Sequence, residues 1–226
     1  MKDQIINEIR ENISVNQSVI DNCVDSIELA ANVMISVIKS GNKILWCGNG
    51  GSAADAQHLA TELMGGMGNY DRKPFPSIAL TTDTSFLTAW SNDTDFESVF
   101  SRQIQGIGNQ DDLLIGISTS GNSGNIIAAI KQAKFKGLKT ILFTGRTGGK
   151  MKNLADVTIF VPSDNTQRIQ ESHIMIGQIL CGLIEKKIIG KINLGNAIFA
   201  FPGVQSYHPN PEPWFAKKEG GPVIDM

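Results

Sequence analysis

The chain contains 226 residues, of which 41% are hydrophobic and 19% are charged, and its formal net charge is -2 at pH 7. This length suits one compact domain with a sizeable core. The near balance of charges excludes a globally basic surface of the kind that attracts nucleic acid or anionic membranes, so we expect neither as a partner.

Three features favour a cytoplasmic location. The N-terminal stretch MKDQIINEIRENISVN mixes charged residues into its apolar ones and lacks the uninterrupted apolar core of a signal peptide. No apolar run of the sequence approaches the ~18 residues that span a bilayer. The cysteines, which are Cys23, Cys47 and Cys181, are odd in number and widely spaced, and this suits a reducing compartment better than a disulfide framework.

The first forty residues are expected to be helical, because isoleucines recur with a period of about 3.6 residues from Ile5 to Ile13 and residues 27–38 continue the pattern. Short apolar segments bounded by turn residues follow at 43–48, 76–82, 112–118, 139–145 and 157–162. Helix-length stretches separate them, most clearly at 52–66, 96–108 and 124–137. Apolar strands without polar alternation, interleaved with helices, predict an α/β fold with a parallel sheet covered on both faces.

Residues 166–190 form the last predicted helix. Its apolar residues surround much of the circumference, so we expect it to be buried against the sheet or another subunit. After residue 191 the composition changes to a Pro- and Gly-rich stretch without periodicity. We therefore predict a single domain over 1–190 and an appendage over 191–226, to which the sequence assigns no function.

A glycine-rich turn, GNGGSA at 48–53, connects the first predicted strand to the following helix. This turn fits the dinucleotide fingerprint G-x-G-x-x-A, which also requires an acidic residue at the end of the second strand about 20 residues further on. Here the second strand ends near Asp83, roughly 35 residues beyond Gly48, which is too far for that fingerprint. The spacing disfavours a dinucleotide and leaves a single sugar phosphate as the alternative ligand.

A second loop, STSGNSGN at 118–125, follows the third predicted strand and opens a helix. Its hydroxyl groups, together with the backbone N–H groups and dipole of a helix N-terminus, favour an anion. No lysine stands at the position that a nucleoside-triphosphate loop requires, so the pattern predicts one phosphate monoester. The alternative interpretation is an ordinary helix cap and turn.

Two helices carry residues suited to metal binding or proton transfer. His58 and Glu62 stand four residues apart on one helix face, a spacing that suits two metal ligands or a ligand and a general base. On the late helix, Gln170 and Gln178 differ by about 80° in direction, so both can face one cleft. His173 lies between them and is either a ligand or a hydrogen-bonded structural histidine.

Five stretches in chain order are distinctive: CGNGGSAADAQHLATEL, ALTTDTSFLTAWSND, FSRQI, LIGISTSGNSGNIIAAI and RIQESHIMIGQIL. Together they resemble the SIS (sugar isomerase) family, and within it the isomerases of heptose phosphates, from near the N-terminus to about residue 190. The resemblance implies an SIS domain, which is a flavodoxin-like three-layer αβα sandwich with a five-stranded parallel sheet. It also implies a homotetramer with active sites between subunits and one Zn2+ ion per subunit.

The resemblance also implies roles for individual residues. The substrate would contact the glycine turn, the ND pair of the second motif, the hydroxyl-rich loop and the late helix, through Asn49, Gly50, Gly51, Ser52, Asn92, Asp93, Ser118, Thr119, Ser120, Ser123 and Gln170. The metal positions match His58, Glu62, Gln170 and Gln178. Glu62 also matches the carboxylate that transfers protons, and Gln178 occupies the second catalytic position.

Gln178 departs from the family pattern, which has a histidine at this position as metal ligand and proton-transfer partner. A glutamine oxygen can bind zinc weakly but cannot titrate near neutral pH. General acid–base groups typically contribute about 10²–10⁴-fold in rate. Either another group, such as His208 of the appendage, supplies the proton transfer, or the activity is reduced or differently directed.

Two functions therefore remain. The first is isomerisation of sedoheptulose 7-phosphate to D-glycero-D-manno-heptose 7-phosphate through an enediol, the first step of nucleotide-heptose biosynthesis for lipopolysaccharide or capsule. The second is a non-catalytic SIS protein that binds a sugar phosphate as a sensor or serves as a protein adaptor. The presence of His58, Glu62, Gln170 and the hydroxyl-rich loop favours the isomerase. Gln178 favours the second interpretation.

Overall fold

The structure is a computed structural model that describes residues 1–189. The appendage predicted for 191–226, including His208, lies outside the described residues. The elements in chain order are α1 (Lys2–Lys39), β1 (Ile44–Gly48), α2 (Gly51–Gly65), β2 (Ser77–Ala79), α3 (Thr84–Asp93), α4 (Val99–Ile107), β3 (Leu113–Ser118), α5 (Gly124–Phe135), β4 (Lys139–Gly145), a 3₁₀ turn (Gly149–Met151), β5 (Val157–Val161) and α6 (Thr166–Ile189).

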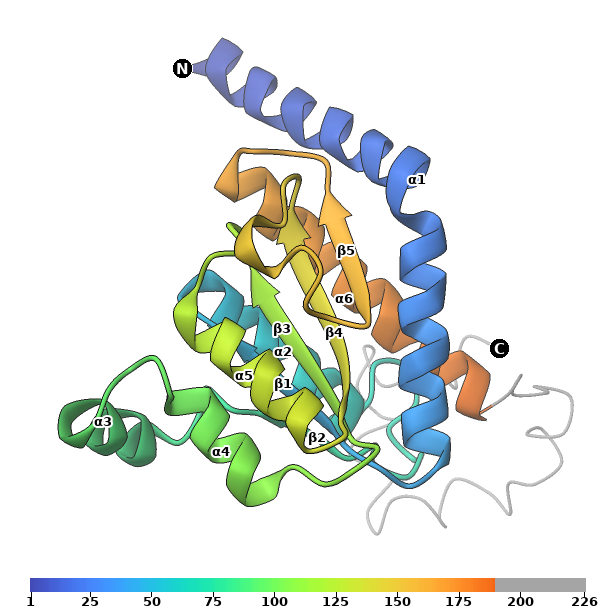
Figure 1. The fold of residues 1–226 in the computed structure, drawn as a ribbon. Helices are drawn as coiled ribbons and strands as arrows, with labels where there is room; N and C mark the ends of the chain where they lie inside the picture. The colour runs from blue at the N-terminus through green and yellow to red at the C-terminus, as the bar shows by residue number, and fades with distance from the viewer. Residues whose placement is uncertain (190–226) are drawn as a thin grey trace, which may run out of the picture. The chain divides into compact units, whose positions relative to one another are not determined.

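The five strands form one parallel sheet in the order β2-β1-β3-β4-β5. Helices α4 and α5 cover one face of the sheet, and α1, α2 and α6 cover the other (Figure 1). The predicted three-layer αβα sandwich is confirmed, and the strand order is that of flavodoxin-like folds. In such sheets ligands bind where loops leave the carboxyl ends of the strands.

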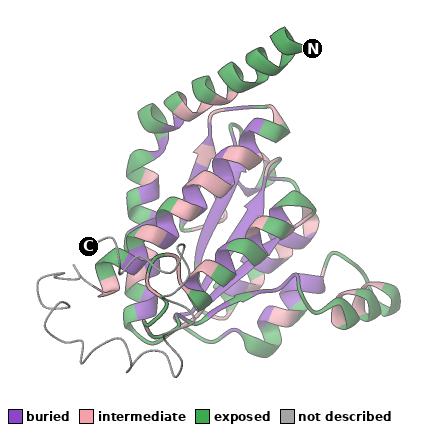
Figure 2. Ribbon diagram, turned by 180° about the vertical axis from the view of Figure 1, so that it is seen from behind, coloured by how far each residue is buried: buried purple, intermediate pink, exposed green. Residues whose placement is uncertain are grey.

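The central strands are buried on both faces. Every residue of β1 and β3 is buried, as the purple sheet in Figure 2 shows. Because helices exclude water from both faces, apolar side chains are favourable at successive positions and not only at alternate ones. This explains why continuous apolar segments, without polar alternation, located the strands correctly in the sequence.

The structure differs from the sequence prediction between β2 and β3. Strand β2 is only three residues long, and helix α3 was not among the predicted helices. The segment of α3 is rich in Thr, Ser and Asn, which favour turns, and none of its residues is fully buried. The carboxylate of Asp83 accepts a hydrogen bond from the Phe86 N–H and caps the helix, while Phe86 and Trp90 stack and pack on the core beneath α4.

Helix α1 has two unlike halves. From Val19 onward its buried side chains pack on the sheet, whereas the N-terminal half extends beyond the body of the domain (Figure 1). Along the helix, apolar side chains remain 44–61% exposed on one face, at Ile6, Ile9, Ile13, Ile20 and Val24. No helix within residues 1–189 is long and apolar enough to cross a membrane.

Candidate active site

The two loops selected from the sequence lie side by side. Strands β1 and β3 are paired in parallel, with Gly48 opposite Ile117, so both loops leave the same edge of the sheet. The side-chain amides of Asn49 and Asn125 exchange two hydrogen bonds, of 2.9 and 2.8 Å, between the two loops. Asn125 is buried, and the amide pair therefore joins the glycine turn to the start of α5.

The glycine turn brings the backbone close to the start of α2. A Cβ at position 48 would strike the backbone of Ser52, and Gly50 has a left-handed φ of 56° at the cap of α2. A Cβ at position 51 would lie 2.6 Å from Nε2 of Gln170. Gln170 thus lies against Gly51 in the predicted substrate stretch from Asn49 to Ser52, of which Ser52 is buried.

The hydroxyl-rich loop is tightly folded between β3 and α5. The Ser118 and Ser123 hydroxyls lie 3.1 Å apart, Thr119 is half-buried and Ser120 is exposed. Ser123 occupies the cap position of α5, as the alternative interpretation expects, but within this described loop its hydroxyl makes no capping hydrogen bond. The first turn of α5 therefore keeps its backbone N–H groups available to an anion.

His58 and Glu62 of α2 form a cluster with Gln178 of α6. The distance from His58 Nε2 to Glu62 Oε1 is 3.0 Å, and Gln178 Nε2 lies 2.9 Å from His58 Nε2 and 3.1 Å from Glu62 Oε1. The helices approach closely at Gly177, where a Cβ would strike the Leu59 side chain. Glycine at position 177 therefore allows Gln178 to reach the His58–Glu62 pair.

The spacing of the cluster atoms is close to that of the ligands on a small divalent cation. Ligand atoms on a tetrahedral zinc ion, bound at about 2.0–2.1 Å, lie about 3.3–3.4 Å apart, and the three cluster atoms lie 2.9, 3.0 and 3.1 Å apart. Turning the Gln178 amide by 180° would present an oxygen to the ion. Within residues 1–189, no three His, Cys, Asp or Glu side chains converge, so a metal here would depend on a glutamine ligand.

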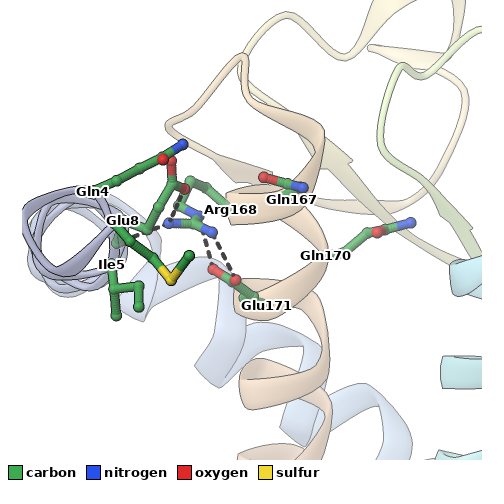
Figure 3. A pocket seen from close by; sticks show the side chains of 8 residues that line it. Gln4, Ile5, Glu8, Gln167, Arg168, Gln170 and Glu171 are labelled. Carbon is green, nitrogen blue, oxygen red and sulfur yellow. Dashed lines mark hydrogen bonds and ion pairs between the residues drawn. The ribbon is translucent and has the colours of Figure 1, made fainter.

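Gln170 lies two turns before Gln178 on α6, which is about 12 Å along the helix axis. It contacts Gly51 and, among the described residues, makes no hydrogen bond with the cluster. It also borders a shallow cavity of about 610 Å³ between α1 and α6, but its side chain points away from α1 (Figure 3). In that cavity Arg168 pairs with Glu8 and Glu171, so its charge is already compensated.

Asn92 and Asp93 make no hydrogen bond to the other predicted residues within the described part of the chain. They stand at the exposed C-terminal end of α3, where their side chains bond to each other over 2.8 Å. Figure 1 shows α3 projecting at the outer edge of the domain, beyond α4. Among the described residues, neither side chain makes a hydrogen bond to the two loops.

His173 points into the core. It is fully buried, packs against Phe143, and its Nε2–H donates to the carbonyl oxygen of Thr144 over 3.2 Å. Its Nδ1 is buried and has no partner in the described part of the chain. Burial lowers the pKa of His173 to about 4, against the opposing effect of the Thr144 hydrogen bond. The geometry is that of a neutral structural histidine.

Acid is expected to destabilise the fold through His173. The pKa of the His173 ring is about 6.5 in the unfolded chain and about 4 in the folded chain. The stability that this residue contributes is therefore complete above pH 6.5 and is lost as the pH falls toward 4, by about 3 kcal/mol in all. Urea unfolding at several pH values measures it, and His173→Gln should have a shallower pH dependence. Identical slopes for the two proteins would contradict this assignment.

Asp55 is a further candidate site residue that the sequence analysis did not select. It stands three residues before His58 and seven before Glu62, hence on the same face of α2. Its Oδ2 is buried without a partner among the described residues. Burial raises the pKa of Asp55 to about 6, although His58 opposes the rise. A carboxyl group whose pKa is raised by burial near the cluster is a candidate for a functional role, and helical spacing was the signal that could have found it.

Comparisons with known proteins identify the family of this chain. The SIS domain model matches residues 9–145. The phosphoheptose isomerase of Sulfurimonas denitrificans is 50% identical over 192 residues, which are 84% of this chain and 98% of that protein. The corresponding protein of Akkermansia muciniphila is 48% identical over 190 residues, which are 84% of this chain and 100% of the relative.

Solved structures point to the same group. The phosphoheptose isomerase from Neisseria gonorrhoeae is similar with a TM-score of 0.78 and 41% identity, covering 82% of this chain and 98% of that one. Both the sequence and the fold are thus shared over nearly the whole length of these relatives. The protein belongs to the SIS domain family, among its phosphoheptose isomerases.

Proposed function

We propose that the protein interconverts sedoheptulose 7-phosphate and D-glycero-D-manno-heptose 7-phosphate, the first step of nucleotide-heptose biosynthesis. The observation that carries this proposal is the joined pair of loops, with a histidine and a carboxylate on the helix that follows the first loop. The name shared by relatives that are 50% and 48% identical supports the choice of substrate.

The two loops hold the substrate. Ser118, Thr119, Ser120 and Ser123 bind the phosphate at the start of α5, where backbone N–H groups and the helix dipole favour an anion. The glycine turn from Asn49 to Ser52 and the Gln170 amide orient the sugar through hydrogen bonds to its hydroxyl groups. This binding fixes the reacting carbons near α2, so that proton transfer occurs within one bound complex.

Glu62 transfers the proton. Its carboxylate removes a proton from C1 of the ketose, the released electron pair forms the C1–C2 double bond, and the carbonyl oxygen on C2 gains a proton, giving the enediol. Return of the proton to C2, with loss of the hydroxyl proton on O1, gives the aldose. His58, 3.0 Å from the carboxylate, and Gln178 hold Glu62 in place.

The proposal includes a zinc ion. His58, Glu62 and Gln178 would hold it, and Gln170 remains the predicted further ligand. When bound, such an ion stabilises negative charge on the substrate oxygen while the proton moves. Dialysis against a chelator should then abolish turnover and zinc should restore it; full activity of the metal-free protein would contradict the assignment.

The protein is proposed to act as a cytoplasmic homotetramer. The apolar face of α1 from Ile6 to Val24 is exposed in one chain, and other subunits can bury it. The exposed position of Asn92 and Asp93 leaves both side chains free to contact another subunit. The cysteines are unpaired and buried, which suits a reducing compartment. Analytical ultracentrifugation tests the assembly, and a monomer at micromolar concentration would contradict it.

Gln178 favours one competing function, a sugar-phosphate sensor or adaptor without catalysis, because an amide cannot transfer protons at neutral pH. The variant Gln178→His separates the two. If Glu62 suffices as the proton carrier, the unmodified protein turns over substrate, and the variant adds an ionisation near pH 6–7 to the kcat/KM profile. Turnover by the variant alone would instead identify a binding protein that has lost one catalytic group.

A further inference from the structure

A buried ion pair stands next to the cluster but outside it. Arg72 comes from the loop between α2 and β2, and Glu185 comes from the last turns of α6. Their Nε and Oε2 atoms lie 2.9 Å apart, and the two side chains are only 3% and 11% exposed. The Glu185 carboxylate also accepts the backbone N–H groups of Met67 and Gly68, over 3.0 and 2.9 Å. The Glu185 carboxylate therefore holds both ends of the loop segment from Met67 to Arg72.

The same guanidinium reaches the residue proposed to transfer the proton. Arg72 Nη2 donates to the backbone carbonyl of Glu62 over 2.9 Å, Nη1 donates to the carbonyl of Lys73 over 3.0 Å, and the guanidinium stacks on the Phe75 ring at 4.1 Å. The Glu62 carbonyl belongs to the last turn of α2, where backbone carbonyls attract cations. All three nitrogen atoms of the guanidinium therefore donate to fixed acceptors.

The geometry also links α2 to α6. Glu185 follows Gln178 by seven residues and so lies on the same face of α6. Gln178 touches the Glu62 side chain, while Glu185 holds the Glu62 backbone through Arg72. The position of Glu62 relative to α6 is therefore fixed at two points. The first is the contact with Gln178, and the second is the Arg72–Glu185 pair, which lies outside the cluster.

We propose that Arg72, held by Glu185, is a positioning residue that fixes the last turn of α2 and thereby aims the Glu62 carboxylate. This inference rests on the proposed function of Glu62. A planar guanidinium with several fixed donors can do this, whereas an ammonium group can satisfy the charge but not all three acceptors at once. Loss of the guanidinium should displace Glu62 without removing any group that touches the substrate.

The test compares Arg72→Gln and Arg72→Lys with a matched control, Lys43→Gln. The control breaks another buried pair, Lys43 with Asp112, at the amino ends of β1 and β3 on the opposite edge of the sheet. In both cases the carboxylate left behind keeps backbone N–H partners. Arg72→Gln also loses the hydrogen bonds to the Glu62 and Lys73 carbonyls and the stacking on Phe75, so it should cost more stability than Lys43→Gln, measured as the midpoint of urea unfolding.

Among molecules that remain folded, Arg72→Gln is expected to lower kcat for sedoheptulose 7-phosphate by about 100-fold with little change in KM, because a displacement of about 1 Å has such an effect. Arg72→Lys should recover part of the loss, and Lys43→Gln should keep the full kcat. If Arg72→Gln does not fold, Arg72→Lys makes the comparison alone. Equal kcat values in the arginine variants and the control would overturn the proposal.

A second measurement does not depend on turnover. The Gly66 N–H bonds to the Glu62 carbonyl over 3.1 Å, so hydrogen exchange of Gly66 reports on this turn. Arg72→Gln should speed that exchange by about 10-fold or more while Lys43→Gln leaves it unchanged. Unchanged exchange in Arg72→Gln would overturn the positioning role. An inactive unmodified protein would instead count against the proposed function, and the exchange result would still decide the role of Arg72.

Discussion

Replacing Glu62 with glutamine is expected to reduce turnover of sedoheptulose 7-phosphate by at least about 10²–10⁴-fold. The amide has nearly the same volume as the carboxylate, so the contacts with His58 and Gln178 can persist, but it cannot accept a proton. A loss of this size corresponds to roughly 3–5 kcal/mol of barrier. Steady-state kinetics on the purified variant measures it.

Binding of the phosphate should survive this substitution, because the hydroxyl-rich loop is built from β3 and α5 and not from α2. Titration calorimetry with inorganic phosphate checks this separation of binding from catalysis. Glu28→Gln is the control, because it makes the same chemical change at an exposed position of α1, in another helix than Glu62. Normal turnover by Glu62→Gln would remove Glu62 from the mechanism.

Replacing Gly121 with alanine is expected to disrupt the phosphate loop. Gly121 has a left-handed φ of 63°, and a Cβ there would strike the carbonyl of Gly148 in the neighbouring loop. The left-handed conformation alone costs an alanine about 1–2 kcal/mol, and the collision forces the two loops apart. We expect a total loss of about 2–4 kcal/mol in the free energy of unfolding and weaker phosphate binding.

Gly41 provides the matched control for this variant. It also has a left-handed φ, of 79°, but no atom lies within 4 Å of its added Cβ. Gly41→Ala should therefore lose only the conformational part, and it should leave phosphate binding unchanged. Urea unfolding and calorimetry measure both effects. Equal losses in the two variants would show that contact with Gly148 does not matter.

Local patterns predicted the fold and much of the site. Apolar runs located the strands because both faces of the sheet are covered, and turn residues located the loops at its carboxyl edge. The pairing of His58 with Glu62 followed from helical spacing alone. Helix α3 was missed because its polar composition favours turns, while its stability comes from Phe86 and Trp90 packing on the core.

Contacts between distant segments were not predictable in this way. Helical spacing showed that Gln170 and Gln178 can face one cleft, but not that Gln170 rests on Gly51 while only Gln178 reaches His58. The burial that raises the pKa of Asp55 and the pairing of Arg72 with Glu185 also depend on how elements pack. Helical spacing could have placed Asp55 beside His58, but its burial and the pairing of Arg72 with Glu185 emerge only from the structure.

This chain is expected to catalyse the isomerisation with Gln178 in place. NMR spectra of sedoheptulose 7-phosphate incubated with the zinc-loaded protein test it directly. New signals of D-glycero-D-manno-heptose 7-phosphate should grow with enzyme concentration and be missing with Glu62→Gln. A ketose spectrum that stays unchanged with the folded, zinc-loaded protein would contradict it.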